Sequence, residues 1–301
     1  MEQKTETRIS RNCDRCSSVP GLLAVLSFAI GLCATNLATA QSGGLILEHS
    51  DSWNLPKEWV LSVGNFRMEF VLIPAGSFLM GSPDETGDGD EYPRHDVVIS
   101  QPFYLGKYEV TQEQWEEVMG SNPSRFRGAK LPVETVSWKD CQVFLAKLAA
   151  KTGRKFALPT EAQWEYACRA GTTTFWSFGD TNAAVDEFAW GKSNSGGQSH
   201  PVGGKKPNPW GLYDMHGNVS EWCADRYAKH TYSNGVVVDP VGPTVQEGSA
   251  VCRGGAWGDD PDLQRSAYRN CNGIGNAHHG IGLRCVLLVS SLPAPGPDGK
   301  R

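Results

Sequence analysis

The sequence predicts an α+β domain with few helices, short strands and much irregular loop. Glycine and proline are frequent, with 34 and 18 copies in 301 residues, which indicates many turns. Ten Trp, eleven Phe and eight Tyr accompany them, and disordered chains lack such aromatic residues. Helical periodicity is concentrated in residues 111–171, and glycine-rich turns dominate the second half. Together these observations favour an ordered fold in which large side chains hold irregular backbone.

The first forty residues are typical of a secretory signal peptide. A basic start precedes an apolar run over about 19–34 and a small-x-small site, Ala38-Thr39-Ala40, before Gln41. The run is short for a transmembrane span, so an uncleaved anchor is the weaker interpretation. We therefore expect an exported bacterial protein, periplasmic or extracellular, with no transmembrane span after signal cleavage.

The rest of the chain is long enough for one large domain. We assign residues 41–67 to an N-terminal lead-in, residues 68–289 to the domain, and the Pro- and Gly-rich residues 290–301 to a flexible tail. The formal net charge of −5 is the opposite of the basic footprint of nucleic-acid-binding proteins, so nucleic acid is not an expected partner.

Apolar alternation predicts short strands before the first helix. Residues 68–82 are expected to form two strands joined by a turn at Pro74-Ala75-Gly76, and residues 95–110 to form two more. The acidic residues 83–95 resemble a calcium loop, but the glycine and distal glutamate of an EF-hand are missing. A solvated loop is therefore the favoured interpretation.

Three helices are predicted next, each with a capping residue at its start. Thr111 with Gln114, and Thr160 with Gln163, fit the capping box, and Ser137 can cap the second helix. Each helix is expected to end at a glycine: Gly120, Gly153 and Gly171. No convincing helix is predicted after the third.

A candidate metal site lies around the turn at Gly217-Asn218. Asp214 and Glu221 are seven residues apart, and the turn would bring both carboxylates toward one centre. Carboxylates combined with backbone carbonyls suit Ca²⁺. The alternative is a turn whose carboxylates accept hydrogen bonds from backbone N–H groups, and spacing alone does not separate the two.

Two histidine features are weaker candidates. The adjacent pair His278-His279 could bind a transition metal or relay protons, but neighbouring side chains converge poorly and no third ligand stands nearby. We therefore favour a polar loop there. His216, which directly precedes Gly217, is interpreted as structural.

The common nucleophile and cofactor motifs are absent. The sequence contains no G-x-S-x-G elbow, no Walker or G-x-G-x-x-G loop and no H-E-x-x-H. Six cysteines follow the leader, and in an exported protein such an even number predicts disulfides, with fifteen arrangements open. A catalytic Cys252 or Cys271 remains as an alternative to pairing. The six are Cys141, Cys168, Cys223, Cys252, Cys271 and Cys285.

Several stretches, taken together, resemble the formylglycine-generating enzyme (sulfatase-modifying factor) family. They occur in the family's order over about residues 68–286 and are FVLIPAGSFLMGS, FYLGKYEVTQEQW, LPVETVSW, LPTEAQWEYACRAGT, NPWGLYDMHGNVSEWCAD, CRGGAW and GIGLRC. The resemblance implies a variant of the C-type lectin fold with few helices and much irregular backbone. This agrees with the class predicted from composition and periodicity.

The resemblance also implies a structural Ca²⁺ at the turn around Gly217. Carried onto this chain, the ligands are the side chains of Asp214 and Glu221 and the backbone carbonyls of Gly217 and Val219. Ser220 replaces the Trp that the family usually has before the glutamate. A second calcium site of the family would match residues 189–202, where this chain does not align well enough to assign ligands.

The family's enzymes oxidise a sulfatase cysteine to formylglycine with O₂ and copper bound by two cysteines that follow a G-G-S motif. In this chain the serine of that motif is Ala256, the first cysteine position is Asp259, and the second has no counterpart. Asp260 and Asp262 extend what we expect to be a solvated loop. Because carboxylates cannot replace thiolates as Cu(I) ligands, no catalytic residue is assigned and copper is not expected.

The family's disulfides also transfer incompletely. Cys168 and Cys285 match two of its disulfide cysteines, but Ser266 stands where the partner of Cys168 is expected, and the partner of Cys285 is missing. Cys223, Cys252 or Cys271 could substitute.

The sequence therefore predicts an exported family module, stabilised by Ca²⁺, that binds a ligand, with a protein or peptide such as a sulfatase as the expected partner. The alternative is an active formylglycine-generating oxidoreductase that uses displaced cysteines such as Cys252 or Cys271. A sugar-binding module is a third reading, which rests on fold analogy alone.

Overall fold

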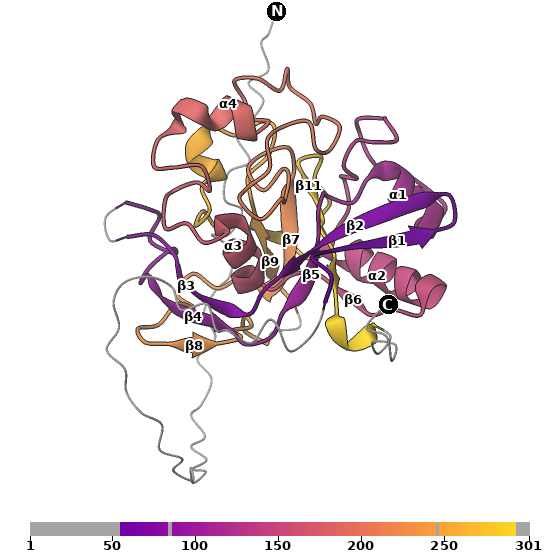
Figure 1. Cartoon of the computed structure of the whole chain (residues 1–301). Coiled ribbons are helices and arrows are strands. Elements are labelled where there is room, and N and C mark those ends of the chain that lie inside the picture. The colour runs from indigo at the N-terminus through magenta and orange to yellow at the C-terminus, as the bar shows by residue number, and fades with distance from the viewer. Residues whose placement is uncertain (1–54, 84–85, 245–246, 293–301) are drawn as a thin grey trace, which may run out of the picture.

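The computed structural model describes residues 55–83, 86–244 and 247–292, and three sheets organise them (Figure 1). The five-stranded sheet has the order β1-β2-β5-β12-β6, the four-stranded sheet β10-β9-β7-β11, and the three-stranded sheet β3-β4-β8. The strands are β1 (Glu58–Val63), β2 (Phe66–Ile73), β3 (Gly76–Met80), β4 (His95–Ile99), β5 (Phe103–Gly106), β6 (Phe156–Ala157), β7 (Ser220–Arg226), β8 (Val237–Val238), β9 (Ser249–Arg253), β10 (Asn270–Gly273), β11 (Ile281–Gly282) and β12 (Val286–Leu287).

The three predicted helices are present, and each begins at its predicted cap. They are α1 (Gln112–Met119), α2 (Trp138–Thr152) and α3 (Glu161–Arg169). Thr111, Ser137 and Thr160 all form complete capping boxes, because the third helical residue returns a hydrogen bond to the cap. Gly120 and Gly153 take the left-handed conformation that ends the first two helices, as expected.

Two details of the helix prediction are wrong. The left-handed residue that ends α3 is Ala170, at φ 48°, and not Gly171. Beyond it, the single-turn helix α4 (Val185–Phe188) and short 3₁₀ turns at Asn182–Ala184, Pro261–Gln264 and Val289–Ser291 appear where no helix was expected. A single turn is too short to produce a recognisable apolar period.

The chain changes sheets at the turn after Ile73. β2 and β3 are the two strands expected in residues 68–82, but they do not pair with each other. β2 lies between β1 and β5 in the five-stranded sheet, whereas β3 pairs with β4 in the three-stranded sheet. This turn therefore joins two layers of the molecule.

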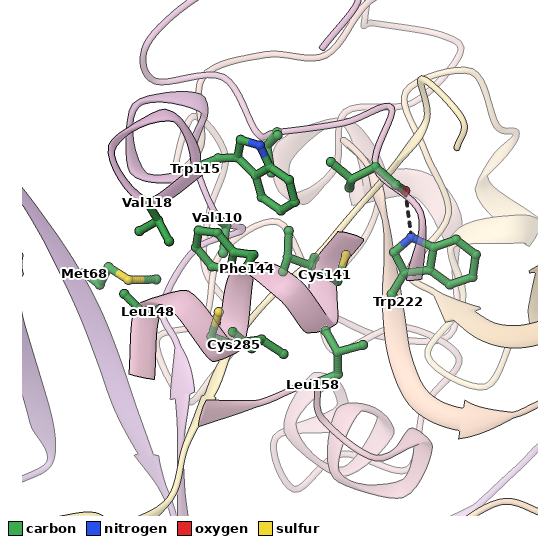
Figure 2. Packing of buried hydrophobic residues seen from close by; sticks show 14 of the residues in the cluster. Met68, Val110, Trp115, Val118, Cys141, Phe144, Leu148, Leu158, Trp222 and Cys285 are labelled. Carbon is green, nitrogen blue, oxygen red and sulfur yellow. Dashed lines mark hydrogen bonds between the residues drawn. The ribbon is translucent and has the colours of Figure 1, made fainter. Parts of the chain in front are cut away.

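Two apolar cores lie on the two sides of this junction. In the first core, α1 and α2 pack on β2, and the rings of Trp115 and Phe144 stack with centroids 4.9 Å apart (Figure 2). Trp222 of β7 enters the same core, and its indole N–H donates to the Val136 carbonyl at 3.0 Å. In the second core α3 packs against β3, β4, β7 and β9 around the fully buried Trp164. Both cores hold the loops that follow β5, β7 and β9.

The described residues begin inside the predicted lead-in, where β1 pairs with β2 along its whole length. No helix in residues 55–83, 86–244 or 247–292 is long and apolar enough to cross a membrane. The predicted signal peptide and residues 293–301 of the predicted tail lie outside the described residues.

Candidate functional site

Residues 254–269 connect β9 to β10 and contain the position that the resemblance implies for the family's copper site. Gly254 and Gly255 have φ of 94° and 70°, which only glycine adopts readily. A Cβ on Gly255 would lie 2.5 Å from the Leu263 carbonyl oxygen, and one on Gly254 would lie 3.1 Å from the Trp164 ring. The two glycines thus allow the loop to fold tightly onto α3 and onto itself.

The expectation of a solvated loop is wrong for Asp259. Its side chain is buried, and its carboxylate accepts a hydrogen bond from the Ala256 N–H at 2.8 Å. Burial raises the pKa of Asp259 to about 6. Asp260 and Asp262 are exposed, as expected, and Asp260 pairs with Lys192. Asp259 therefore holds the turn closed, because a short acceptor at this position satisfies a backbone donor.

The acidic loop before β4 is also less solvated than expected. Glu91 is fully buried, and Arg265 donates to both of its carboxylate oxygens at 2.8 Å. Arg269 donates to both oxygens of the buried Glu161 at 2.6 and 2.9 Å, and to the Asp90 carbonyl at 2.8 Å. The bidentate Arg265–Glu91 pair therefore joins the acidic loop to the loop of the copper-site position, and the Arg269–Glu161 pair joins the latter loop to α3.

Cys168 and Ser266 lie side by side, as expected if they occupy the two positions of a family disulfide. The Cys168 sulfur and the Ser266 hydroxyl oxygen are 3.6 Å apart, and both residues are fully buried. Burial raises the pKa of the Cys168 thiol to about 12, so the thiol stays protonated. A serine thus occupies the place of the second sulfur.

His216 is structural, as the sequence indicated. Its Nδ1 donates to the Gln264 carbonyl at 2.7 Å, and its Nε2 accepts from the Ser177 amide and hydroxyl at 3.2 and 2.9 Å. Burial lowers the pKa of His216 to about 4. The neutral, buried ring therefore links Ser177, which follows α3 in the chain, to Gln264 in the loop between β9 and β10.

The prediction of disulfides is wrong for five of the six cysteines that follow the leader. Cys141, Cys168, Cys223, Cys252 and Cys285 are free thiols, and all are buried. Burial raises the pKa of each of these thiols above its ordinary value. They pack as small apolar side chains in the cores, which is the usual behaviour of a buried free cysteine.

The turn at Gly217-Asn218 brings the predicted calcium ligands into a buried polar cluster. Glu221 accepts from the Arg284 guanidinium at 2.7 and 3.0 Å and from the Trp164 indole at 2.7 Å. Arg284 also donates to the Gly106 carbonyl, at the end of β5. Glu221, one of the predicted calcium ligands, is therefore already paired with Arg284.

Asp214 offers the vacant acceptor of this cluster. One carboxylate oxygen accepts from the Gly203 amide at 2.6 Å, and the other is buried without a hydrogen-bond partner. Burial, with the charge of Glu221 adding to it, raises the pKa of Asp214 to about 6, and burial also raises the pKa of the neighbouring Glu109 well above its ordinary value. If all were ionised, Glu109, Asp214 and Glu221 would carry three negative charges against the buried Arg284, with Lys205 as a further cation acting on Asp214.

These residues fit a hard divalent cation in part. No three His, Cys, Asp or Glu side chains of the described chain are arranged to hold a metal, so backbone carbonyls must complete a site, as predicted for Gly217 and Val219. The unpartnered Asp214 oxygen and the uncompensated charge are the two features that a Ca²⁺ ion would satisfy. Glu221 would have to share its oxygens with Arg284.

A row of aromatic rings from three separate loops lies beside residue 256. We call Phe126, Trp257, His278 and His279 the aromatic surface. The Trp257 ring centroid is 5.5 Å from those of Phe126 and His279, and the two histidine rings stack at 4.2 Å. All four side chains are half-buried. The surface is rigid because the Trp257 indole donates to the His279 carbonyl and its backbone N–H donates to the Asn218 carbonyl.

Local sequence patterns do not indicate this surface. They predict a polar loop for the histidine pair and carry no signal at Phe126. More than a hundred residues of sequence separate Phe126 from Trp257, and no local sequence pattern indicates that the two lie close together. The pairing of β11 with β7 and the hydrogen bonds that Thr135 and Trp257 donate to the carbonyls of His278 and His279 bring them together.

Comparison with known proteins gives the fold and the site a family. A sequence model of the sulfatase-modifying factor enzyme 1-like domain matches residues 64–289. The chain is 32% identical to the formylglycine-generating enzyme of Streptomyces coelicolor, over 72% of this chain and 88% of that protein. It is 29% identical to the chaperone protein LppX of Paenibacillus barcinonensis, over 69% of this chain and 86% of that protein.

The solved structures agree with the sequence relatives. Treponema denticola variable protein 1 superposes with a TM-score of 0.72 at 31% identity, over 78% of this chain and all of that one. The chain also matches Chlamydia serine/threonine-protein kinases named pkn1, but spans only 38% of their length. The fold is the α+β, C-type lectin-like variant that the sequence predicted, and the chain belongs to the sulfatase-modifying factor enzyme 1-like family.

Proposed function

We propose that this chain is an exported binding module of its family and that it does not carry out the copper-dependent oxidation. The observation that carries this proposal is the state of residues 256–259. The positions implied for the family's serine and first copper cysteine hold Ala256 and Asp259, which are hydrogen-bonded to each other. A buried turn of this kind offers Cu(I) no thiolate.

The thiols elsewhere support the same proposal. Copper binding and disulfide exchange both require an accessible thiolate. Cys168, Cys223 and Cys252 have no exposed surface, and burial raises the pKa of all three thiols. Cys252, one of the displaced cysteines considered as an alternative nucleophile, lies inside β9 and faces the first core.

A protein or peptide is the partner that we favour. The relative LppX is named a chaperone, and the Streptomyces relative is named for generating formylglycine. The aromatic surface beside residue 256 supplies half-exposed rings, which are the anchors that protein interfaces use most. A sulfatase is one candidate partner.

We further propose that Ca²⁺ stabilises the module at the turn around Gly217. The Asp214 side chain with the carbonyls of Gly217 and Val219 would hold the ion, and Glu221 would share one oxygen with it. The ion would supply only charge compensation and would fix the loops on which the aromatic surface stands. The buried, unpartnered oxygen of Asp214 supports this proposal.

The decisive assay measures oxidation of a substrate cysteine. The purified protein is incubated with Cu(I), O₂ and a peptide that contains the sulfatase motif, and the aldehyde product is measured by mass spectrometry. We expect none. The Streptomyces coelicolor relative, treated identically, is the positive control. Thiol titration runs in parallel, and we expect the native protein not to react and the unfolded protein to expose its free thiols.

Aldehyde formation above the level of a metal-free blank would contradict the proposal and establish the oxidoreductase alternative. In that event, Cys252→Ser and Cys271→Ser, made separately, show which cysteine is responsible. Loss of activity in one variant, with an unchanged melting temperature, identifies the nucleophile.

A further inference from the structure

An exposed cation, Arg125, lies beside the aromatic surface. The Arg125 guanidinium lies over the Phe126 ring, 5.4 Å from its centroid. Its charge acts on the buried Glu134, but within the described part of the chain no carboxylate forms an ion pair with it. The guanidinium can therefore bind a carboxylate of a ligand at this surface.

Two ring groups of the surface have defined hydrogen-bond roles. The Gly280 amide donates to Nδ1 of His278 at 3.1 Å, so the proton of the neutral ring is on Nε2. The Trp257 indole N–H is already occupied by the His279 carbonyl at 3.2 Å. What remains is a set of ring faces with an imidazole N–H and a guanidinium beside them.

The matching ligand combines a flat apolar group with an acceptor-only anion. Ring faces stack on aromatic or proline side chains, and donors beside them bind carboxylates. We infer that the aromatic surface binds an acidic peptide segment in which an aromatic residue lies next to an aspartate or glutamate, with Trp257 and Phe126 contacting the ring and Arg125 the carboxylate.

This inference rests on the proposed function and names the ligand class of that same surface. It requires no new covalent chemistry. The ligand ring would pack against the edge-to-face pair of Trp257 and Phe126, whose planes meet at 86°. The carboxylate would then lie within reach of Arg125 at the open side of Phe126.

The test uses two short peptides that differ only in charge. The probes are acetyl-Gly-Phe-Asp-Gly-amide and its Asn counterpart, titrated into full-length protein with ¹⁵N-labelled tryptophan. The Trp257 indole signal is assigned with the variant Trp257→Phe. We expect the Asp probe to shift this signal and to bind about tenfold more tightly than the Asn probe, the ratio typical of one charge-assisted hydrogen bond.

Matched variants locate the charge. Arg125→Gln should reduce affinity for the Asp probe to that for the Asn probe. Arg127→Gln is the control, because Arg127 is also exposed on this loop but donates to the Asn122 carbonyl at 2.7 Å, and it should change nothing. Both variants are at exposed positions, so each is expected to fold.

Each other outcome overturns a defined part of the inference. Equal binding of both probes overturns the acidic class and leaves the proposed binding function standing. No shift of the Trp257 signal by either probe overturns the peptide assignment. Tighter binding of a hyaluronan tetrasaccharide at the same signal replaces the peptide with an acidic sugar. The proposed function itself fails only in the aldehyde assay, which is independent of these titrations.

Discussion

At the scale of single residues, Ser266 stands out because a sulfur in place of its hydroxyl oxygen would allow a disulfide with Cys168. Its hydroxyl oxygen is 3.6 Å from the Cys168 sulfur, in a fully buried position. We expect the Ser266→Cys variant to form a disulfide with Cys168 under oxidising conditions. The bond would close a loop of 98 residues, for which chain entropy predicts a stabilisation of about 4.7 kcal/mol. Urea unfolding with and without reductant measures the gain.

The double variant Cys168→Ser with Ser266→Cys is the matched control, since it exchanges the two atoms and removes the possibility of a bond. If the single variant gains no stability on oxidation while mass spectrometry confirms the bond, the two backbones are not positioned for an unstrained disulfide. The hydroxyl–thiol contact would then be only a packing contact.

At the scale of secondary-structure elements, Asp225 couples β7 to α3. Its carboxylate accepts from the Glu161 amide at 2.7 Å, at the start of α3. Burial, together with the charge of Glu161, raises the pKa of Asp225 to about 7 from an ordinary value of 3.8. A carboxyl whose folded pKa is raised favours folding in its protonated form, so its contribution to stability decreases as the pH rises through 7.

We expect Asp225→Asn to remove part of the pH dependence of stability between pH 6 and 8. The amide oxygen can still accept from the Glu161 N–H, but it takes up no proton. For a pKa of about 7, the wild-type protein should lose about 1.4 kcal/mol over this range through Asp225, and the variant should not. Thermal melts at both pH values, with the exposed Asp262→Asn as control, measure the difference. An unchanged slope in Asp225→Asn would show that Asp225 is ionised at pH 6.

The helices and the sheets differ in how well the sequence predicts them. All three caps could be predicted because Thr111, Ser137 and Thr160 act on backbone within three residues. The separation of β2 and β3 into different sheets could not, because it depends on β5 and β4, which come later in the chain. Glu91 was expected in solvent for the same reason, since its partner Arg265 is 174 residues away.

At the scale of the whole molecule, the cluster around Arg284 joins two sheets. Arg284 links Glu221 of β7 to the Gly106 carbonyl of β5, and the Glu109 carboxylate accepts from the Val219 amide at 3.0 Å. The charge balance of this cluster therefore acts on global stability. Here the family resemblance singled out Asp214 and Glu221, but neither resemblance nor spacing indicated that Glu109 lies beside them or that Arg284 binds Glu221.

We expect Ca²⁺ to raise the melting temperature of the wild-type protein and EGTA to lower it, because the ion would compensate the excess negative charge. Asp214→Asn should remove most of this response and, in EGTA, should be as stable as the wild type or more so, since it also removes a buried charge. Asp260→Asn, at an exposed position, is the control. A wild-type melting temperature that is the same in Ca²⁺ and EGTA would mean that Arg284 and bound protons balance the cluster without a metal.

Arg253 gives residues 254–270 an unusual kind of order. Its guanidinium donates to the carbonyls of Ser266, Ala267 and Tyr268 and pairs with Glu165 of α3, so one side chain does for this loop what a neighbouring strand does for a sheet. The loop cannot open one residue at a time. Any opening would leave the buried Glu165 and several backbone carbonyls without their hydrogen-bond donor at the same time. In a protease or amide-exchange experiment, this irregular stretch therefore belongs to the slowest-opening unit of the protein, despite lacking regular secondary structure.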